Sequence, residues 1–376
     1  MQVLLLTLGA AAGAGEAGGF VWSLARALQD RGVDIRLVVV GDGELPSDLP
    51  VRHVPAGPFG GALGTGDHAL SVLANGVLAG AALRRVVAEE VAAGCKVIHA
   101  HWVFPCAGGA IPGVPLVLTA HGPDVRLMER SALARNAGRR LVSRASVLTT
   151  VSLPLASALQ AATGVPVPPE RVHAMPVESA DLEWSSGGGG ALVLGPLTQD
   201  ARTSLAVEAI ACLAELDQPI KLTIAGDGPE RGRLEALAAR RGVSQLIRFH
   251  GTATAMQADA LLRTADVLLD PAVGVGFARF QTRAIMSGVP VVACWDGGGT
   301  LKVGSSELLS RLVLPSGEAI ADSVLDLLGV SGGQDLRRAA GAVLRTQLDA
   351  RSVAGHCVTW YEEAVANPVH SQLRIR

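Results

Sequence analysis

Apolar and polar positions alternate along the first half of the chain in a pattern that predicts strands separated by helices. Gln2–Leu8, Asp34–Val40 and Leu116–Ala120 are short runs made largely of apolar residues. Between the first two, Phe20–Arg31 repeats apolar residues at helical spacing. Strands that lack a polar face and are separated by helices are typical of a parallel sheet covered on both faces. Further strands are expected at Lys96–Ala100 and Ala145–Val151.

The same alternation restarts after a run of serine and glycine at Ser185–Gly190, which is typical of a flexible connector or loop. We therefore expect an α/β fold of two Rossmann-like doubly wound domains that face each other across a cleft. The predicted domains are 1–184 and 191–351, joined by the connector 185–190, with a terminal helix in 352–376 that packs back toward the first domain. The second domain is expected to contain strands at Ala191–Leu194, Ile220–Ala225, Ile247–His250, Val267–Leu269 and Val289–Cys294, and helices at Thr203–Leu216, Glu230–Arg241 and Gln281–Ser287.

Composition narrows the class of protein. The chain has 376 residues, of which 49% are hydrophobic and 18% charged, so two well-packed domains are expected. The net charge is −2 and no basic stripe is present, which argues against a nucleic-acid partner. No apolar run reaches the roughly 18 residues of a membrane-spanning helix. The start lacks a basic leader segment, so we expect no secretory signal.

The five cysteines are scattered and form no Cys-x-x-Cys pair. This distribution predicts neither a disulfide framework nor a zinc site, and it favours a reducing, cytoplasmic location. We expect no metal and no tightly bound cofactor. The sequence does not indicate an oligomeric state.

A glycine-rich loop follows the first predicted strand. Gly13–Gly19 contains a G-x-G-x-x-G pattern, which would suggest an NAD-dependent dehydrogenase. The glycines begin too late after the strand for the tight turn of that motif, and Asp42 matches its acidic residue only loosely. An alternative is that Gly18 and Gly19, at a helix N-terminus, offer backbone N–H groups to an anion. A plain glycine loop without a ligand also fits.

Histidines mark the ends of two predicted strands. His99 and His101 end one strand and point to the same side, and His121 follows the next strand. We interpret His99 as a structural histidine whose hydrogen bonds are satisfied, and His121 as a functional one. His101 and Asp124 are expected to face a ligand, because ligands of such sheets bind at the carboxyl ends of the strands.

The chain resembles the large retaining glycosyltransferase family four, which has the GT-B fold. The resemblance covers nearly the whole chain, and its most specific parts lie in the second half. It rests on Gly18-Gly19, Ala120-His121-Gly122, the GDGPE segment at Gly226–Glu230, ADVLLDP at Ala265–Pro271, and GVGFARFQTRAIMSGVPVVA at Gly274–Ala293. The resemblance implies transfer of a sugar from a nucleoside-diphosphate donor, without a metal and with retention at the anomeric carbon.

The chain departs from this family at four charged positions. The two carboxylates of the family's E-x7-E motif correspond to Val275 and Arg283, and its arginine and lysine in the first loop of the second domain correspond to Pro196 and Ala201. Loss of one preorganised donor typically costs about 10²–10³ in rate. Because arginine can clamp phosphate oxygens with two bonds, three nearby arginines are candidates for a replacement anion cradle. These are Arg202, Arg279 and Arg283.

We therefore expect a glycosyltransferase with an altered donor site and a small soluble acceptor, such as an intermediate of antibiotic or other secondary metabolism. One alternative is a catalytically silent homologue that binds a sugar nucleotide or activates a partner enzyme. The NAD-dependent dehydrogenase is a further alternative. The predicted site comprises His121 as the catalytic residue, His101 and Asp124 on the acceptor side, and Gly18, Gly19, Arg202, Gly228, Gly276, Phe277, Arg279 and Arg283 on the donor side.

Overall fold

The computed structural model divides the chain into two compact units. Unit 1 comprises Met1–Glu178 and Leu348–Arg376, and unit 2 comprises Ser179–Gln347. The structure describes residues 1–9, 19–41, 45, 47–55, 69–176, 187–272, 279–294, 310–329 and 333–368. No helix in these ranges is long and apolar enough to cross a membrane.

Unit 1 is built on a six-stranded sheet whose order is β3-β2-β1-β4-β5-β6. All neighbouring strands pair in parallel. The order reverses direction between β1 and β4, as in a Rossmann fold. The strands are β1 (Gln2–Leu8), β2 (Asp34–Val40), β3 (Val51–Val54), β4 (Val97–His101), β5 (Leu116–Ala120) and β6 (Val147–Thr150).

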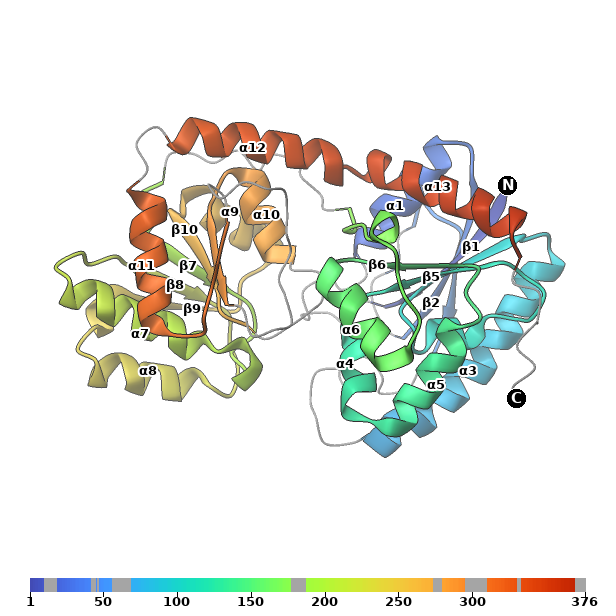
Figure 1. Ribbon diagram of the computed structural model, residues 1–376, viewed down its shortest axis with the longest axis horizontal. Coiled ribbons are helices and arrows are strands. Elements are labelled where there is room, and N and C mark those ends of the chain that lie inside the picture. Colours follow the sequence, from blue (N-terminus) through green and yellow to red (C-terminus); the bar gives the residue numbers. More distant parts are fainter. Residues whose placement is uncertain are drawn as a thin grey trace. The chain divides into compact units, whose positions relative to one another are not determined.

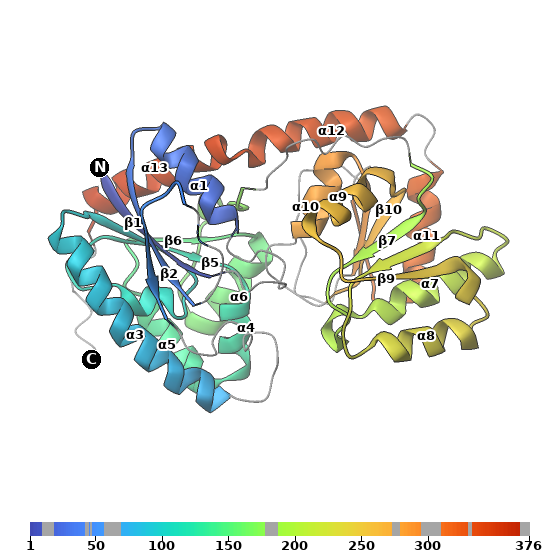
Figure 2. The ribbon, with the colours of Figure 1, turned by 180° about the vertical axis from the view of Figure 1, so that it is seen from behind.

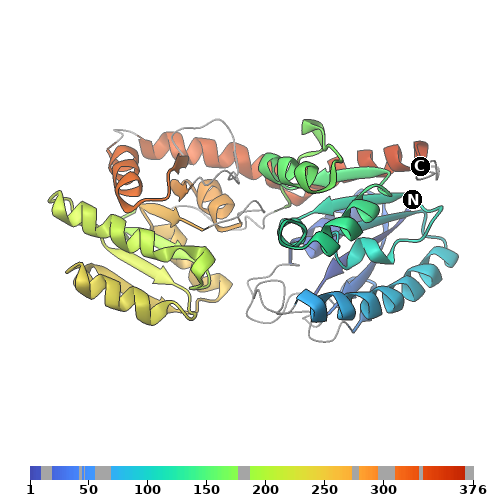
Figure 3. The same ribbon diagram turned by 60° about the horizontal axis from the view of Figure 1, so that its bottom comes forward.

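Helices cover both faces of this sheet (Figures 1 and 3). α1 and α13 pack on one face and share a single apolar core with the strands, while α3 and α5 lie against the opposite face. Covering both faces explains why the strands are apolar almost throughout. The helices of unit 1 are α1 (Gly19–Asp30), α3 (Ala69–Ala92), α4 (Pro123–Arg130), α5 (Ala132–Val142), α6 (Leu153–Thr163) and α13 (Ala350–Ala366), with 3₁₀ turns at Cys106–Gly109 and Pro169–Arg171.

Unit 2 repeats the arrangement with the order β12-β11-β10-β7-β8-β9, again entirely parallel and reversing between β7 and β10. α7, α8 and α11 share one core, and α9 and α10 lie on the other face (Figure 2). Its strands are β7 (Ala191–Leu194), β8 (Leu222–Ala225), β9 (Ile247–Gly251), β10 (Val267–Asp270), β11 (Val291–Cys294) and β12 (Ser310–Val313). Its helices are α7 (Thr203–Glu215), α8 (Arg231–Arg240), α9 (Ala255–Thr264), α10 (Arg279–Ser287), α11 (Gly317–Leu328) and α12 (Gly333–Leu348), with 3₁₀ turns at Gln199–Ala201 and Ser244–Leu246.

This architecture confirms the predicted α/β class with two Rossmann-like units. β1, β2, β5 and β7 have the bounds expected from the apolar runs. Local signals also set helix ends. Ser152 accepts the Leu155 N–H at the start of α6, and Gly164 ends that helix with a left-handed φ of 77°.

Residues 187–190 of the glycine-serine segment form a loop that is hydrogen-bonded to the rest of unit 2. The Asp266 carboxylate accepts the Gly188 N–H at 2.7 Å and the Gly190 N–H at 2.8 Å. The Gly189 N–H bonds to the Thr264 carbonyl oxygen. These bonds fix the segment against unit 2 at the start of β7.

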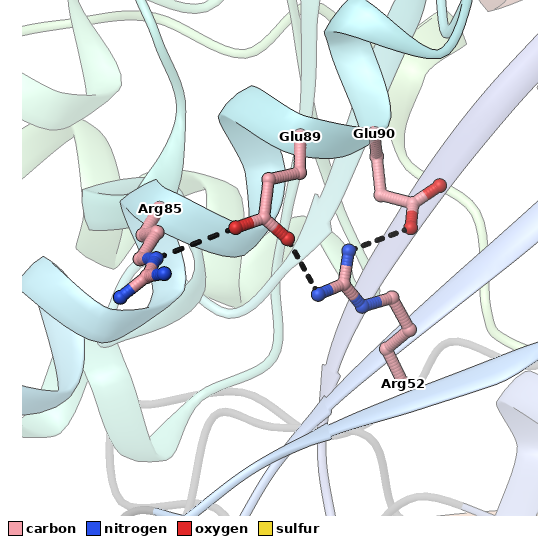
Figure 4. A network of polar contacts seen from close by, with 4 residues as sticks. All are labelled: Arg52, Arg85, Glu89 and Glu90. Carbon is pink, nitrogen blue, oxygen red and sulfur yellow. Dashed lines mark hydrogen bonds and ion pairs between the residues drawn. The ribbon is translucent and has the colours of Figure 1, made fainter.

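An ion-pair network fastens the edge strand β3 of unit 1 to α3 (Figure 4). The Arg52 guanidinium bonds Glu89 at 2.7 Å and Glu90 at 3.1 Å, and Glu89 also bonds Arg85. Arg52 lowers the pKa of Glu89 through this hydrogen bond. The network covers part of an edge strand whose free N–H and C=O groups could otherwise pair with another chain.

Two glycines of unit 2 provide a matched test of backbone packing. A Cβ on Gly226 would lie 1.8 Å from the Gly195 carbonyl oxygen, whereas a Cβ on Gly232, in the exposed first turn of α8, meets nothing within 4 Å. We expect Gly226→Ala to destabilise the protein by about 1–3 kcal/mol or more, because backbone must move. Gly232→Ala should stabilise it by about 0.5–1 kcal/mol, since alanine is the better helix former. Urea unfolding of both variants measures this, and equal effects would contradict the close approach at Gly226.

Candidate functional site

Two histidines of unit 1 lie together at the carboxyl edge of its sheet, beside the point where the strand order reverses. His101 is the last residue of β4, and His121 directly follows β5. Phe20, in the first turn of α1, packs its ring 5.5 Å from His101 and 5.2 Å from His121 between ring centres. This edge is where ligands of doubly wound sheets bind.

His101 and His121 form a buried, hydrogen-bonded pair. Nδ1 of His101 lies 3.0 Å from Nε2 of His121, and the two residues are 0% and 5% exposed. Burial lowers the pKa of His101 to about 3, and burial together with His101 lowers the pKa of His121 well below its ordinary value. Both rings are therefore neutral near pH 7, and each keeps one donor and one acceptor nitrogen.

Trp102 adds a further aromatic ring to this site, beside that of Phe20. Its ring packs 4.4 Å from that of His121, and its backbone has a φ of 82°, which is rare for a bulky side chain. Such backbone strain is often found at functional sites. In the described part of the chain, the buried Trp102 Nε1 and His101 Nε2 have no protein hydrogen-bond partner. These are two buried polar atoms whose hydrogen-bonding capacity the described protein groups do not use.

Asp124, predicted on the acceptor side, uses its carboxylate to hold two loops together. One oxygen accepts the Val103 N–H at 2.9 Å, and the other accepts the Gly122, Val125 and His121 N–H groups. Burial raises the pKa of Asp124, and these four bonds oppose that rise. The side chain thus fixes the segments that carry Trp102 and His121.

His99 has a hydrogen-bond partner at each ring nitrogen, as the interpretation of a structural histidine requires. Nδ1 lies 2.8 Å from the Tyr361 hydroxyl, and Nε2 lies 2.9 Å from the Thr119 hydroxyl. Its ring centre is 4.2 Å from that of His101. His99 therefore connects the ring of His101 to Tyr361 of α13.

The carboxyl edge of unit 2 is shaped by two loops in close backbone contact. The Leu197 N–H bonds to the Asp227 carbonyl, and the Glu230 N–H bonds to the Leu197 carbonyl. A Cβ on Gly228 would lie 2.5 Å from the Leu197 carbonyl oxygen, so glycine is needed there. The Gly228 N–H itself is bonded by the Asp227 carboxylate at 2.8 Å.

Two of the three arginines of the predicted anion cradle have side chains that the structure describes. Arg202 precedes α7 with a left-handed φ of 47°, a conformation that favours glycine. Arg283, on α10, bonds the Asp259 carboxylate of α9 at 2.5 and 3.1 Å, so this neighbour compensates its charge. The backbones of Gly19 and Arg279 begin α1 and α10. Gly18, Gly276, Phe277 and the Arg279 side chain lie outside the described residues.

Asp270 was not among the predicted site residues. It ends β10, beside the point where the strand order of unit 2 reverses, and its carboxylate accepts a bond from Gln281 Nε2 at 2.8 Å. Burial raises its pKa, and the bond from Gln281 opposes the rise. The sequence feature that could have identified Asp270 is its position directly after the apolar run Val267–Leu269, at the carboxyl end of a strand. In the described ranges, no three His, Cys, Asp or Glu side chains are arranged to hold a metal ion.

Two family models match the chain. The model of glycosyltransferase family 4 matches residues 17–176, and that of the glycosyl transferases group 1 matches residues 190–329. Together they span most of both units. The chain therefore belongs to the glycosyltransferases of family four.

Relatives with assigned activities support this placement. The chain is 31% identical to a 2-deoxystreptamine glucosyltransferase of Streptomyces kanamyceticus over 47% of each chain. It is 27% identical to an MMP α-(1→4)-mannosyltransferase of Mycolicibacterium hassiacum, with 68% of this chain and 66% of that protein aligned. It is also 28% identical to a D-inositol 3-phosphate glycosyltransferase of Geodermatophilus obscurus, with 94% and 88% aligned. The chain thus spans about half the length of the first relative and about two thirds of the second.

Solved structures share the fold. Sucrose-phosphate synthase from Thermosynechococcus elongatus superposes with a TM-score of 0.73 at 16% identity, covering 97% of this chain and 100% of that one. HepE from Anabaena in complex with UDP gives a TM-score of 0.72 at 17% identity, covering 96% and 100%. At these identities the likeness establishes the GT-B fold. A dinucleotide-binding dehydrogenase gains no support from these matches.

The low pKa of His101 predicts an acid-sensitive unit 1. Its folded-state pKa of about 3 lies below the ordinary value of 6.5, so the unfolded chain binds a proton first as the pH falls. Stability is therefore full above about pH 6.5 and is lost toward pH 3, at about 1.4 kcal/mol per pH unit for each such histidine. We expect His101→Asn to reduce that slope by about this amount in urea unfolding between pH 6 and pH 4. An unchanged slope would show that His101 is protonated in the folded protein.

Proposed function

We propose that this chain transfers a sugar from a nucleoside-diphosphate donor to a small polyhydroxylated ring, with retention and without a metal. The observation that carries the proposal is the neutral His101–His121 pair at the carboxyl edge of unit 1, in a member of family four. Two relatives are named for 2-deoxystreptamine and D-inositol 3-phosphate, which are both six-membered carbocycles rich in polar substituents. We propose an acceptor of this kind, such as an antibiotic intermediate, whose ring hydroxyl groups would meet the histidine pair.

Among the described residues, the acceptor side of the proposed site consists of neutral histidines and aromatic rings beside the buried Asp124 carboxylate. Trp102 Nε1 can only donate, so it calls for an oxygen of the ligand, while the neutral His101 Nε2 can accept or donate. The Phe20 ring supplies an apolar surface beside both histidines. Hydroxyl groups on a ring satisfy these requirements, because each hydroxyl both donates and accepts.

The donor side is proposed to lie at the carboxyl edge of unit 2. Arg202, Arg279 and Arg283 are proposed to hold the diphosphate, together with backbone N–H groups of Gly18, Gly19, Gly276 and Phe277. Gly228, whose N–H bonds the Asp227 carboxylate, is proposed to line the donor side with its backbone. Arg202 has a left-handed backbone with a φ of 47°, and such strain is often found at functional sites.

The proposed reaction takes place on one face of the donor sugar. The bond from the anomeric carbon to the phosphate oxygen breaks, and a bond to the acceptor oxygen forms on the same face. The acceptor's proton passes to the departing phosphate, so no separate base is required. The neutral His121 orients a hydroxyl of the donor sugar, and such positioning can account for much of the rate.

A catalytically silent homologue is a second candidate function. It is favoured by Val275 and Arg283 at the positions of the family's two carboxylates, and by the compensated charge of Arg283. Such a protein would bind a sugar nucleotide without transferring the sugar. A turnover assay with sugar derivatives of the nucleoside diphosphate that binds separates the two candidates, because a silent homologue would transfer no sugar.

A calorimetric screen of uridine, guanosine, thymidine and adenosine diphosphates, with NAD⁺ as comparison, tests the donor class. We expect one of the diphosphates to bind and NAD⁺ not to bind. Arg202→Gln should weaken that affinity by about 1–3 kcal/mol, the value of a charge-assisted hydrogen bond. Arg240→Gln, at an exposed position in the last turn of α8, is the matched control. Binding of NAD⁺ alone would overturn the proposal.

His121→Asn tests the catalytic assignment. We expect kcat to fall about 100-fold, the typical cost of losing one preorganised polar group. The nucleoside-diphosphate affinity should stay within about twofold of the wild type, because His121 is not proposed to contact the phosphates. His356→Asn, which changes an exposed histidine of α13, serves as control. Equal kcat in both variants would remove His121 from the mechanism.

A further inference from the structure

A buried chain of hydrogen bonds connects α13 to the middle of the unit 1 sheet. The Tyr361 hydroxyl meets His99 Nδ1, His99 Nε2 meets the Thr119 hydroxyl at 2.9 Å, and Thr119 meets the Thr149 hydroxyl at 2.7 Å. All four residues are 0% exposed. Tyr361 stands 262 residues after His99, so only the fold brings them together.

Which group donates in each of these bonds follows from the Leu118 carbonyl, at the end of the chain of bonds opposite Tyr361. The Thr149 hydroxyl reaches the Leu118 carbonyl oxygen, which can only accept, so Thr149 donates there. Thr119 then donates to Thr149 and accepts from His99. His99 therefore carries its proton on Nε2, and its Nδ1 accepts from the Tyr361 hydroxyl. Burial lowers the pKa of His99 and raises that of Tyr361, which keeps both groups neutral.

The ring of His99 in turn fixes the ring of His101. Their ring centres are 4.2 Å apart, with planes inclined by 32°. A change in the orientation of His99 would therefore displace His101 or rotate it. Because the bond from His101 to His121 is 3.0 Å long, a rotation of His101 would weaken it.

We propose that Tyr361 and His99 are positioning residues, which fix the geometry of the His101–His121 pair from α13. The Tyr361 hydroxyl selects one tautomer and one plane of His99, and His99 sets the plane of His101. This inference rests on the proposed role of His121 in transfer. It gives the C-terminal helix a part in the reaction although none of its residues needs to touch the substrate.

Tyr361→Phe on the full chain tests the proposal, since it keeps the ring and removes only the hydroxyl. Thr359→Val is the matched control, because it removes an exposed hydroxyl from the same helix. We expect Tyr361→Phe to lower kcat about 10- to 100-fold, as misplaced catalytic groups do. Nucleoside-diphosphate affinity should not change. The control should match the wild type in both measurements.

Histidine ¹⁵N NMR of the substrate-free protein gives a second readout that does not depend on turnover. In the wild type, His99 should show the Nε2–H tautomer. In Tyr361→Phe, its signals should change, together with those of His101 and His121. Unmoved His101 and His121 signals would overturn the proposal, and so would a kcat equal to that of Thr359→Val.

The two readouts also separate this inference from the proposed function. If the wild-type chain transfers no sugar, the proposed function fails, and the NMR comparison still decides whether Tyr361 controls the histidine pair. If Tyr361→Phe does not fold, Thr119→Val removes the other partner of His99 and should have the same effects. Thr119→Ser, which keeps the hydroxyl, should restore the wild-type signals and rate.

Discussion

Parallel pairing of the strands is the constraint on which the rest of the structure depends. Because all strands of a unit run in one direction, their carboxyl ends meet at a single edge. His101 at the end of β4 and His121 after β5 become neighbours for this reason alone. In unit 2 the same constraint places the loops after β7, β8 and β10 along one edge. Each unit therefore offers one side on which polar groups collect above a sheet that is otherwise apolar.

Burial then decides what the histidines can do. Burial inside unit 1 disfavours a charged imidazole, so folding keeps His99, His101 and His121 neutral. Their different roles follow from their partners. His99 has two, one of them on α13, and it supports the structure. His101 and His121 bond each other, and His101 keeps one buried nitrogen without a protein partner. Neutral groups that can both donate and accept suit hydroxyl-bearing ligands better than ions.

The charge of Arg283 in unit 2 is compensated by a neighbouring helix. Its guanidinium on α10 pairs with the Asp259 carboxylate of α9. A buried arginine without such a partner would be strongly destabilising. The Asp259 carboxylate therefore keeps Arg283 from being an isolated buried cation.

The sequence by itself determined the α/β class, the bounds of strands such as Gln2–Leu8 and Leu116–Ala120, and the place of His101 and His121 at strand ends. These features follow from the spacing of apolar residues within short segments, which residues close together in the sequence determine. β3, α3 and β12 were not predicted. Tyr361 as a partner of His99, Asp259 as a partner of Arg283, and the strained Trp102 were decided by tertiary structure alone. Each depends on contacts between distant segments and on burial, and no run of neighbouring residues encodes which distant group will lie within hydrogen-bonding reach.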